Sequence, residues 1–255
     1  MRAPISLYSE VQNASYAYPS VRLPREVYSV LPFSNYNGAE LEHSFFQDNY
    51  DFTLNFIYGN NRKNIFINSS QKTFSNLHVD KIAGVVLNTN YNNFRFMSSY
   101  FKINMDTIKS TKVNPSYIAN INLVKKMSFI STGFVYNISN YFVEAEYIYN
   151  EVKDSKEGFK GYYVGVGQTF DKFTPYFMYA KRERKSYEIK HTSYIGLSSL
   201  INASKNAFIF GLRYDFKEGV ALKLQYDYVD YIELSKEVYK STKQNVFSLT
   251  IDFVF

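Results

Sequence analysis

Apolar and polar side chains alternate over segments of about ten residues, and this alternation recurs along almost the whole chain. The last ten residues, V-F-S-L-T-I-D-F-V-F (246–255), show it clearly. One parity carries Phe247, Leu249, Ile251, Phe253 and Phe255. Successive side chains of a strand point to opposite faces, so one face is apolar and the other mixed or polar. A soluble antiparallel sheet can show the same pattern. A chain that ends on an apolar-parity phenylalanine is better explained by the aromatic girdle of a membrane β-barrel.

The composition excludes a helical membrane protein and leaves a β-barrel open. The 255 residues include 25 Tyr and 23 Phe but no Trp, an aromatic content of 19% that is high for a soluble domain. Mean hydropathy is −0.30, and no window approaches the roughly 18 apolar residues of a membrane helix. A β-barrel would also have a low mean hydropathy, because half of the side chains of each strand face the lumen and are polar. The chain has no cysteine, so neither a disulfide nor a thiolate metal site is possible, and we expect no metal and no cofactor.

The charge pattern argues against a nucleic-acid partner. The net charge is +6, but the basic residues are scattered along the segments or bunched between them instead of forming one patch. The run 181–185 is expected at a rim, where Lys and Arg could bind lipopolysaccharide phosphates. The first residues lack the regions of a secretory signal. Since a protein of this type needs export, we expect a mature, trimmed or fragmentary chain.

The alternating segments pair as hairpins and predict roughly eleven antiparallel strands after residue 38. The predicted strands are 40–46, 51–59, 79–87, 94–103, 127–137, 141–151, 159–170, 174–184, 207–216, 220–230 and 246–255. Short turns are expected at 47–50, 88–90, 138–140, 171–172 and 217–219. Longer connections follow the other end, at 60–78, 104–126, 152–158, 185–206 and 231–245. Long loops on one rim and short turns on the other are typical of outer-membrane barrels.

The polar parity of these strands is expected to line the interior. The charged residues on it are Glu144, Glu146, Arg213, Asp215, Lys223 and Asp227. A basic side chain on the lipid face would cost up to about 2–4 kcal/mol at the membrane midplane, so the interior must be polar and would hold water. Glu144 and Glu146 could also do general acid–base work, although lumen lining is the favoured interpretation. We expect no catalytic residue, since His43, His78 and His191 are far apart in sequence. A solvated face of a soluble sheet remains the alternative.

Residues 2–38 do not follow the hairpin pattern and hold four of the six prolines. They contain R-A-P (2–4), two tyrosines at 16 and 18, S-V-R-L-P-R-E-V-Y-S (20–29) and N-G (37–38). This arrangement resembles the general, pore-forming porins of the proteobacterial outer membrane. The family pattern is an Arg-x-Pro strand end, a Tyr-rich stretch, an aromatic-x-Arg-Pro-Pro-x-Glu-x-Tyr-Gly motif and then Asp-Gly. Ser20, Leu23 and Ser29 depart from it, which leaves the detailed path of the loop open. Residues 211–216 and the terminal Phe255 match the family's closing strands.

The resemblance implies a sixteen-stranded, trimeric β-barrel with a constriction loop folded into its lumen. Residues 2–7 would end the fifth strand, 8–38 would form the loop, and 39–255 would supply eleven further strands of one domain, about twelve in all. The first four and a half strands would then be missing from this sequence. The implied constriction residues are Arg2, Glu10, Arg22, Arg25 and Glu26. Phe255 would be the signal for the outer-membrane assembly machinery.

These observations predict a passive-diffusion porin without enzymatic activity, located in the outer membrane of a Gram-negative bacterium. Its partners would be membrane lipid and lipopolysaccharide, small hydrophilic solutes and ions, and two further copies of the chain. Size and charge selection would occur at the constriction loop. An outer-membrane barrel enzyme and a soluble β-sheet binding protein are the alternatives.

Overall fold

The computed structural model describes residues 1–9, 11, 14–29, 34–68, 73–112, 125–153, 158–185, 204–235 and 238–254. One antiparallel sheet accounts for almost all regular structure, and its eleven strands neighbour one another in chain order. The strands are β1 (Asn37–Gln47), β2 (Tyr50–Asn68), β3 (Thr73–Tyr91), β4 (Phe94–Lys112), β5 (Lys125–Ile138), β6 (Tyr141–Val152), β7 (Gly158–Gln168), β8 (Phe173–Lys185), β9 (Ser204–Lys217), β10 (Val220–Ser235) and β11 (Val238–Phe253). The predicted all-β antiparallel fold is therefore confirmed.

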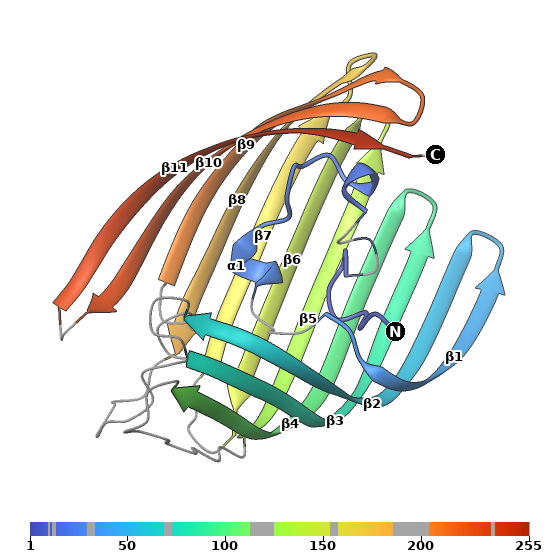
Figure 1. The fold of residues 1–255 in the computed structure, drawn as a ribbon. Helices are drawn as coiled ribbons and strands as arrows, with labels where there is room; N and C mark the ends of the chain where they lie inside the picture. The colour runs from blue at the N-terminus through green and yellow to red at the C-terminus, as the bar shows by residue number, and fades with distance from the viewer. Residues whose placement is uncertain are drawn as a thin grey trace.

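The sheet curves into an open trough, and the inner segment, defined as residues 4–36 where described, lies inside the curve (Figure 1). This segment contains the 3-10 turn η1 (Ser15–Ala17) and the four-residue helix α1 (Arg25–Tyr28). Among the described residues, β1 and β11 each pair with a strand on one side only. An isolated antiparallel bridge between Arg2 and Asn35 lies just before β1. The predicted strand end at 2–7 is thus reduced to this bridge.

No helix in the described part of the chain is long and apolar enough to cross a membrane.

Short turns join the strands in pairs, and a residue with positive φ lies in each of them. These residues are Asp48, Asn92, Ser139, Asp171 and Gly219. Left-handed backbone suits Gly, Asn and Asp, and two-residue hairpin turns of this kind match the twist of the strands. Four of the five predicted turns are at the expected positions. The fifth is wrong: the chain turns at Asn92, after the expected 88–90, because Tyr91 still pairs with Tyr50 and their rings stack 4.2 Å apart.

Several strands continue further than the sequence predicts. The expected loop 60–78 is mostly strand, with β2 and β3 paired from Asn61–Val79 to Asn68–Thr73. Likewise 231–245 is paired from Tyr231–Thr242 to Ser235–Val238. Polar residues obscure the apolar alternation there, yet the hydrogen-bond ladder of a hairpin does not require an apolar face. Apolar periodicity therefore marks only part of each strand.

The two faces of the sheet differ as the alternation predicts. The outward face exposes large apolar side chains across the sheet, including Phe56, Val164, Phe210, Phe247 and Leu249. Phe247 is 76% exposed and Leu249 66%. The concave face buries a mixed core in which Phe101, Phe129, Ile148 and Tyr163 pack with Ile5, Leu7 and Val27 of the inner segment. A soluble sheet with this much exposed apolar surface would aggregate, whereas lipid would cover it.

Candidate functional site

Two acidic side chains on β6 hold the first part of the inner segment. Tyr8 donates its hydroxyl to Oε2 of Glu144 at 2.5 Å, and Tyr28 donates to Oε2 of Glu146 at 2.6 Å. Oε1 of Glu146 accepts from the hydroxyl of Ser131 at 2.6 Å and from the backbone N–H of Leu7 at 3.1 Å. Both glutamates are almost fully buried. Buried carboxylates that accept several hydrogen bonds recover part of the cost of leaving water. We call these groups the carboxylate cluster.

The tyrosines of this cluster remain hydrogen-bond donors at physiological pH. Burial, followed by the charge of Glu144, raises the pKa of Tyr8 well above its ordinary value. Burial and the charge of Glu146 do the same to the pKa of Tyr28. A phenol beside a buried carboxylate keeps its proton because a second negative charge there would be strongly disfavoured.

Neighbouring strands fix the backbone of the same stretch. Ser99 on β4 donates its hydroxyl to the carbonyl oxygen of Ile5 at 2.6 Å. Arg95, also on β4, donates from Nη2 to the carbonyl oxygen of Leu7 at 3.1 Å. The inner segment has little regular structure of its own, so its backbone carbonyls need hydrogen-bond donors from the strands of the sheet.

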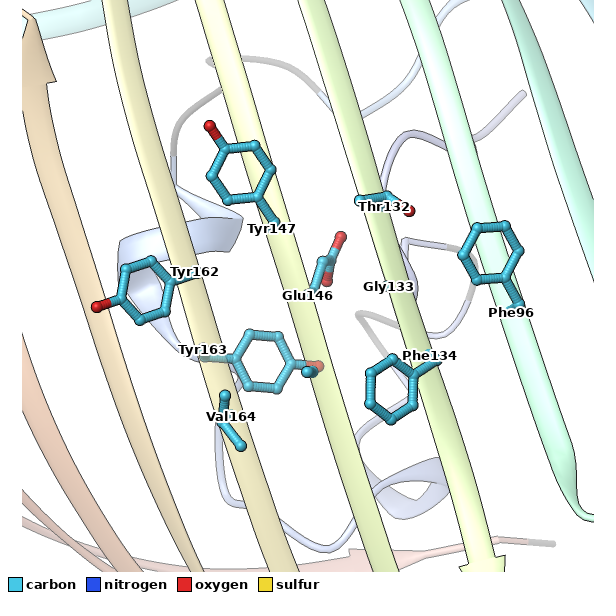
Figure 2. Close-up of a pocket in the computed structure, with 10 residues that line it drawn as sticks. Phe96, Thr132, Gly133, Phe134, Glu146, Tyr147, Tyr162, Tyr163 and Val164 are labelled. Carbon is cyan, nitrogen blue, oxygen red and sulfur yellow. The ribbon is translucent and has the colours of Figure 1, made fainter.

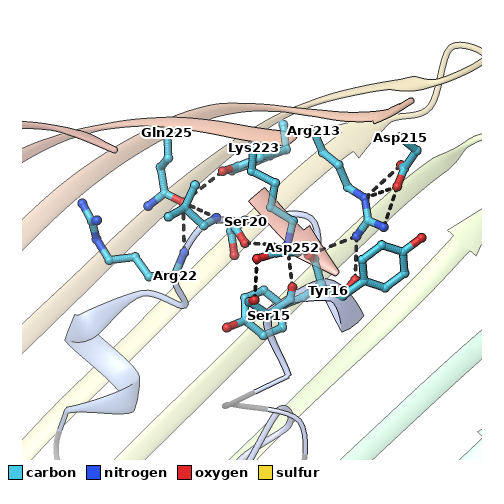
Figure 3. Close-up of polar contacts among 12 residues, drawn as sticks. Ser15, Tyr16, Ser20, Arg22, Arg213, Asp215, Lys223, Gln225 and Asp252 are labelled. Atoms are coloured by element: carbon cyan, nitrogen blue, oxygen red, sulfur yellow. Dashed lines mark hydrogen bonds and ion pairs between the residues drawn. The ribbon is translucent and has the colours of Figure 1, made fainter. Parts of the chain in front are cut away.

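A second group of contacts, the lysine cluster, holds the middle of the inner segment against β10 and β11 (Figure 3). Nζ of Lys223 lies 2.5, 2.7 and 3.2 Å from the carbonyl oxygens of Ser15, Tyr18 and Ser20. It also pairs with Asp252 at 2.7 Å, and Asp252 accepts from the hydroxyl of Ser15 at 2.7 Å. The Lys223 side chain is completely buried. The carboxylate of Asp252 compensates the charge of this buried ammonium, and the three carbonyl oxygens accept its hydrogen bonds.

Arg213 extends this cluster onto β9. Its guanidinium pairs with Asp215 at 2.7 Å and donates from Nη1 to the carbonyl oxygen of Tyr16 at 2.7 Å. The guanidinium carbon lies 4.5 Å from the centre of the Tyr16 ring. The planar guanidinium thus makes an ion pair, a hydrogen bond to a carbonyl oxygen and a cation–π contact at the same time.

Arg22 and its neighbours form the last contacts of the lysine cluster. Arg22 pairs with Asp227 on β10 and donates from Nη1 to the hydroxyl of Ser248 at 2.6 Å. Oε1 of Gln225 accepts from the backbone N–H of Val21 at 2.8 Å. Gln225 in turn donates from Nε2 to Asp227 at 2.7 Å. Strand β10 therefore binds the inner segment at three successive inward positions.

Helix α1 lies against β7 and β8 and completes the attachment. Gly161 on β7 makes room for it, since a Cβ there would lie 2.7 Å from the carbonyl oxygen of Glu26. Glu26 is 3% exposed, and burial raises the pKa of its carboxyl. Arg182 on β8 donates from Nη1 to the hydroxyl of Ser29 at 3.1 Å. The side chain of Arg25 is exposed.

Some of the site residues predicted from the sequence are buried, and others are partly exposed. Glu144, Glu146, Lys223 and Asp227 are 1%, 2%, 0% and 6% exposed in the structure, and their predicted role as pore lining stays a prediction. They are buried because the inner segment lies on them. Arg213 and Asp215 are partly exposed. Of the residues assigned to a constriction, Arg2, Arg22, Arg25 and Glu26 belong to the described chain, and nothing in the structure tests that role, which stays a prediction. Glu10 and Phe255 lie outside the described residues.

Sequence reasoning missed the partners within the inner segment. Tyr8 and Tyr28 contribute the hydroxyls of the carboxylate cluster, and Ser15 contributes to the lysine cluster. The Tyr-rich composition of residues 2–38 was a signal that could have pointed to such donors. Asp252, the acidic residue on the polar parity of the last strand, was a second signal.

Comparison with known proteins supports the fold. No family model matches the sequence, and no curated protein matches it. Among solved structures, OmpT folded in vitro, an outer membrane protein of Vibrio cholerae, matches with a TM-score of 0.55 and 14% identity over 99% of this chain and 74% of that one. Outer-membrane expressed OmpT of the same organism gives 0.56 and 14% over 98% and 74%. A trimer form of in-vitro folded OmpT gives 0.50 and 14% over 84% and 64%.

Fold and comparison together define the class. The chain has the fold of an outer-membrane β-barrel protein, and these neighbours are themselves outer membrane proteins of Vibrio cholerae. At 14% identity the likeness reaches the fold and no further.

The prediction of a passive-diffusion porin is corrected. The neighbours are described only as outer membrane proteins, so ion transport and a channel have no support from them. The carboxylates of Glu144 and Glu146 are covered by the inner segment. The prediction that the chain is not an enzyme is corrected with it, and the outer-membrane barrel enzyme is taken up below as a proposal.

Proposed function

We propose that the chain is a lipid-embedded barrel wall of the sixteen-stranded, trimeric type that holds its inner segment in a fixed position on the concave face. The observation that carries the proposal is the burial of Lys223 against three backbone carbonyls of that segment. Burying a lysine ammonium is costly unless oxygen atoms accept its hydrogen bonds, and here the inner segment provides three of them. The burial of Lys223 therefore requires the inner segment to stay on the concave face. The strands of the sheet then act as a rigid scaffold that holds the exposed side chains of the inner segment in fixed positions.

The edges of the sheet support a larger barrel. Eleven strands in an up-and-down order place β1 and β11 in the same direction, so pairing these edges directly would be parallel, whereas every observed pair is antiparallel. The Arg2–Asn35 bridge already continues the antiparallel order beyond β1. Strand edges in lipid leave backbone groups without partners, which further strands between β1 and β11 would satisfy. A trimer form among the structural neighbours is consistent with a trimer here.

Thiol labelling tests whether the segment is held. The chain has no cysteine, so single substitutions give a clean background. In bilayer-inserted protein, Leu7→Cys should resist a maleimide until the protein is denatured, because Leu7 is 1% exposed. Ala17→Cys, at an exposed position of the same segment, should react at once and is the matched control. Equal labelling rates would show that the segment is not fixed.

Chemical cross-linking in the same membranes tests the proposed oligomeric state. It should give a trimer, and monomers alone would contradict the proposed trimer.

Acid–base catalysis inside the barrel is the second candidate, and the carboxylate cluster is the observation that favours it. Glu144 and Glu146 share one face of β6, and Ser131 of β5 donates to Glu146. Paired carboxylates beside hydroxyls are suited to proton transfer, which typically contributes 10²–10⁴-fold. The bilayer-inserted protein should then hydrolyse fluorogenic ester or peptide substrates, and Glu146→Gln should reduce the rate about 100-fold or more. Glu151→Gln, at the loop end of the same strand, is the control. No hydrolysis above protein-free membranes would remove this candidate.

A further inference from the structure

The outward face of β4 to β7 contains a hollow of about 240 Å³ (Figure 2). Its floor is formed by the short side chains of Thr132 on β5 and Ala145 on β6. The surrounding outward side chains are Phe96, Phe134, Tyr147, Tyr162 and Val164. The inner segment lies behind these strands in Figure 2, so the hollow opens on the side that faces lipid.

A group of charged side chains lies next to this hollow, toward the long-loop rim. Lys160 on β7 and Lys181 on β8 both pair with Glu183, at 2.7 and 2.5 Å. Lys160 shares the outward parity of Tyr162 and is two residues away, or about 7 Å along the strand. Lys181 is the direct partner of Tyr162 in the β7–β8 register. Two ammonium groups share one carboxylate, which leaves one net positive charge at the edge of the hollow.

We propose that the hollow and the two lysines together bind one phosphorylated, acylated lipid of the outer leaflet. A lysine ammonium has three donors, so each can keep its contact with Glu183 and still donate to a phosphate. A hydrocarbon chain in the hollow would cover the apolar side chains around Thr132 and Ala145. The net positive charge of the two lysines with Glu183 favours an occupant that carries phosphate. The proposal rests on the outer-membrane barrel proposed above.

The charged half of the site is tested by titration with bis-phosphorylated lipid A, read by native mass spectrometry of the full chain released from nanodiscs. Replacing the two lysines together, Lys160→Ser with Lys181→Ser, should weaken lipid A binding about tenfold. Glu183→Gln should strengthen it severalfold, because it frees both ammonium groups. Lys217→Ser, at the short-turn rim, should change nothing. The same lipid without phosphates should bind wild type and the double variant equally.

Filling the hollow tests the hydrocarbon half separately. Ala145→Leu should weaken lipid A binding, whereas Val143→Leu, on the same face of β6 but outside the hollow, should not. The proposal is overturned if the double lysine variant binds lipid A like wild type. It is also overturned if Ala145→Leu alters the oligomeric state but not lipid binding, since a second copy would then occupy the hollow. Protein that does not insert into bilayers at all would instead refute the proposed barrel.

Discussion

Replacing Lys223 by methionine is predicted to destabilise the folded protein by about 3 kcal/mol, the lower end of the range for breaking a buried ion pair. The substitution keeps a flexible apolar stem of similar length and removes only the ammonium. Three carbonyl oxygens of the inner segment then lose their shared donor. Asp252 loses its ion-pair partner and keeps the hydroxyl of Ser15. The lower value is expected because Asp252 is 8% exposed and can recover some solvation.

Urea unfolding in lipid vesicles gives the free energy directly, with tyrosine fluorescence as the signal, because the chain has no tryptophan. Lys217→Met, at an exposed position where β9 ends, is the matched control and should cost less than about 0.5 kcal/mol. The double variant Lys223→Met with Asp252→Asn should recover part of the loss, since it removes the unpaired carboxylate. If Lys223→Met and Lys217→Met unfold at the same urea concentration, the lysine cluster does not hold the segment.

Three further predictions concern α1 and the outward face. Gly161→Ala should cost about 1–3 kcal/mol, because its Cβ would lie 2.7 Å from the carbonyl oxygen of Glu26 and 3.2 Å from Ile148; wild-type stability would show that α1 does not contact β7. The pKa of Glu26 is raised by burial, so the folded state binds this proton more tightly than the unfolded state, and stability should fall as pH rises from the ordinary value of 4.5 through the raised one. Glu26→Gln should flatten that slope in urea titrations, and an unchanged slope would contradict the assignment. Leu249→Arg should cost about 2–4 kcal/mol in lipid vesicles, whereas Ser241→Arg, nearer the long-loop end of β11, should cost little; equal costs would mean that this face does not contact hydrocarbon.

Alternation of side chains was enough to predict the sheet. Each predicted strand overlaps an observed one, because burial on one face and lipid on the other impose a period of two. Turn positions were predictable where Gly, Asn or Asp could adopt positive φ, as at Asp48, Asp171 and Gly219. The strand ends nearest the long loops were not predictable, because paired backbone in water needs no apolar pattern. The β10–β11 pairing from Tyr231–Thr242 to Ser235–Val238 is an example.

The attachment of the inner segment could not be predicted from the sequence in the same way. Its contacts join residues far apart in the chain, such as Tyr8 and Glu144, which are 136 positions apart, or Arg22 and Asp227, 205 positions apart. No local periodicity records such pairs. Inward-facing charges were read as water-facing because a polar interior can hold water or polar protein groups equally well. Only the position of the segment decides between them.

A double-mutant cycle between Tyr8→Phe and Glu144→Gln tests most directly whether the inner segment is fixed on the wall. The Tyr8 hydroxyl donates to the Glu144 carboxylate at 2.5 Å, and a hydrogen bond to a charged group contributes about 1.5–3 kcal/mol. Urea unfolding of the four proteins in lipid vesicles should therefore give a coupling energy of at least about 1 kcal/mol. Costs that add within about 0.5 kcal/mol would show that the two side chains do not interact, and would contradict a segment fixed inside the barrel.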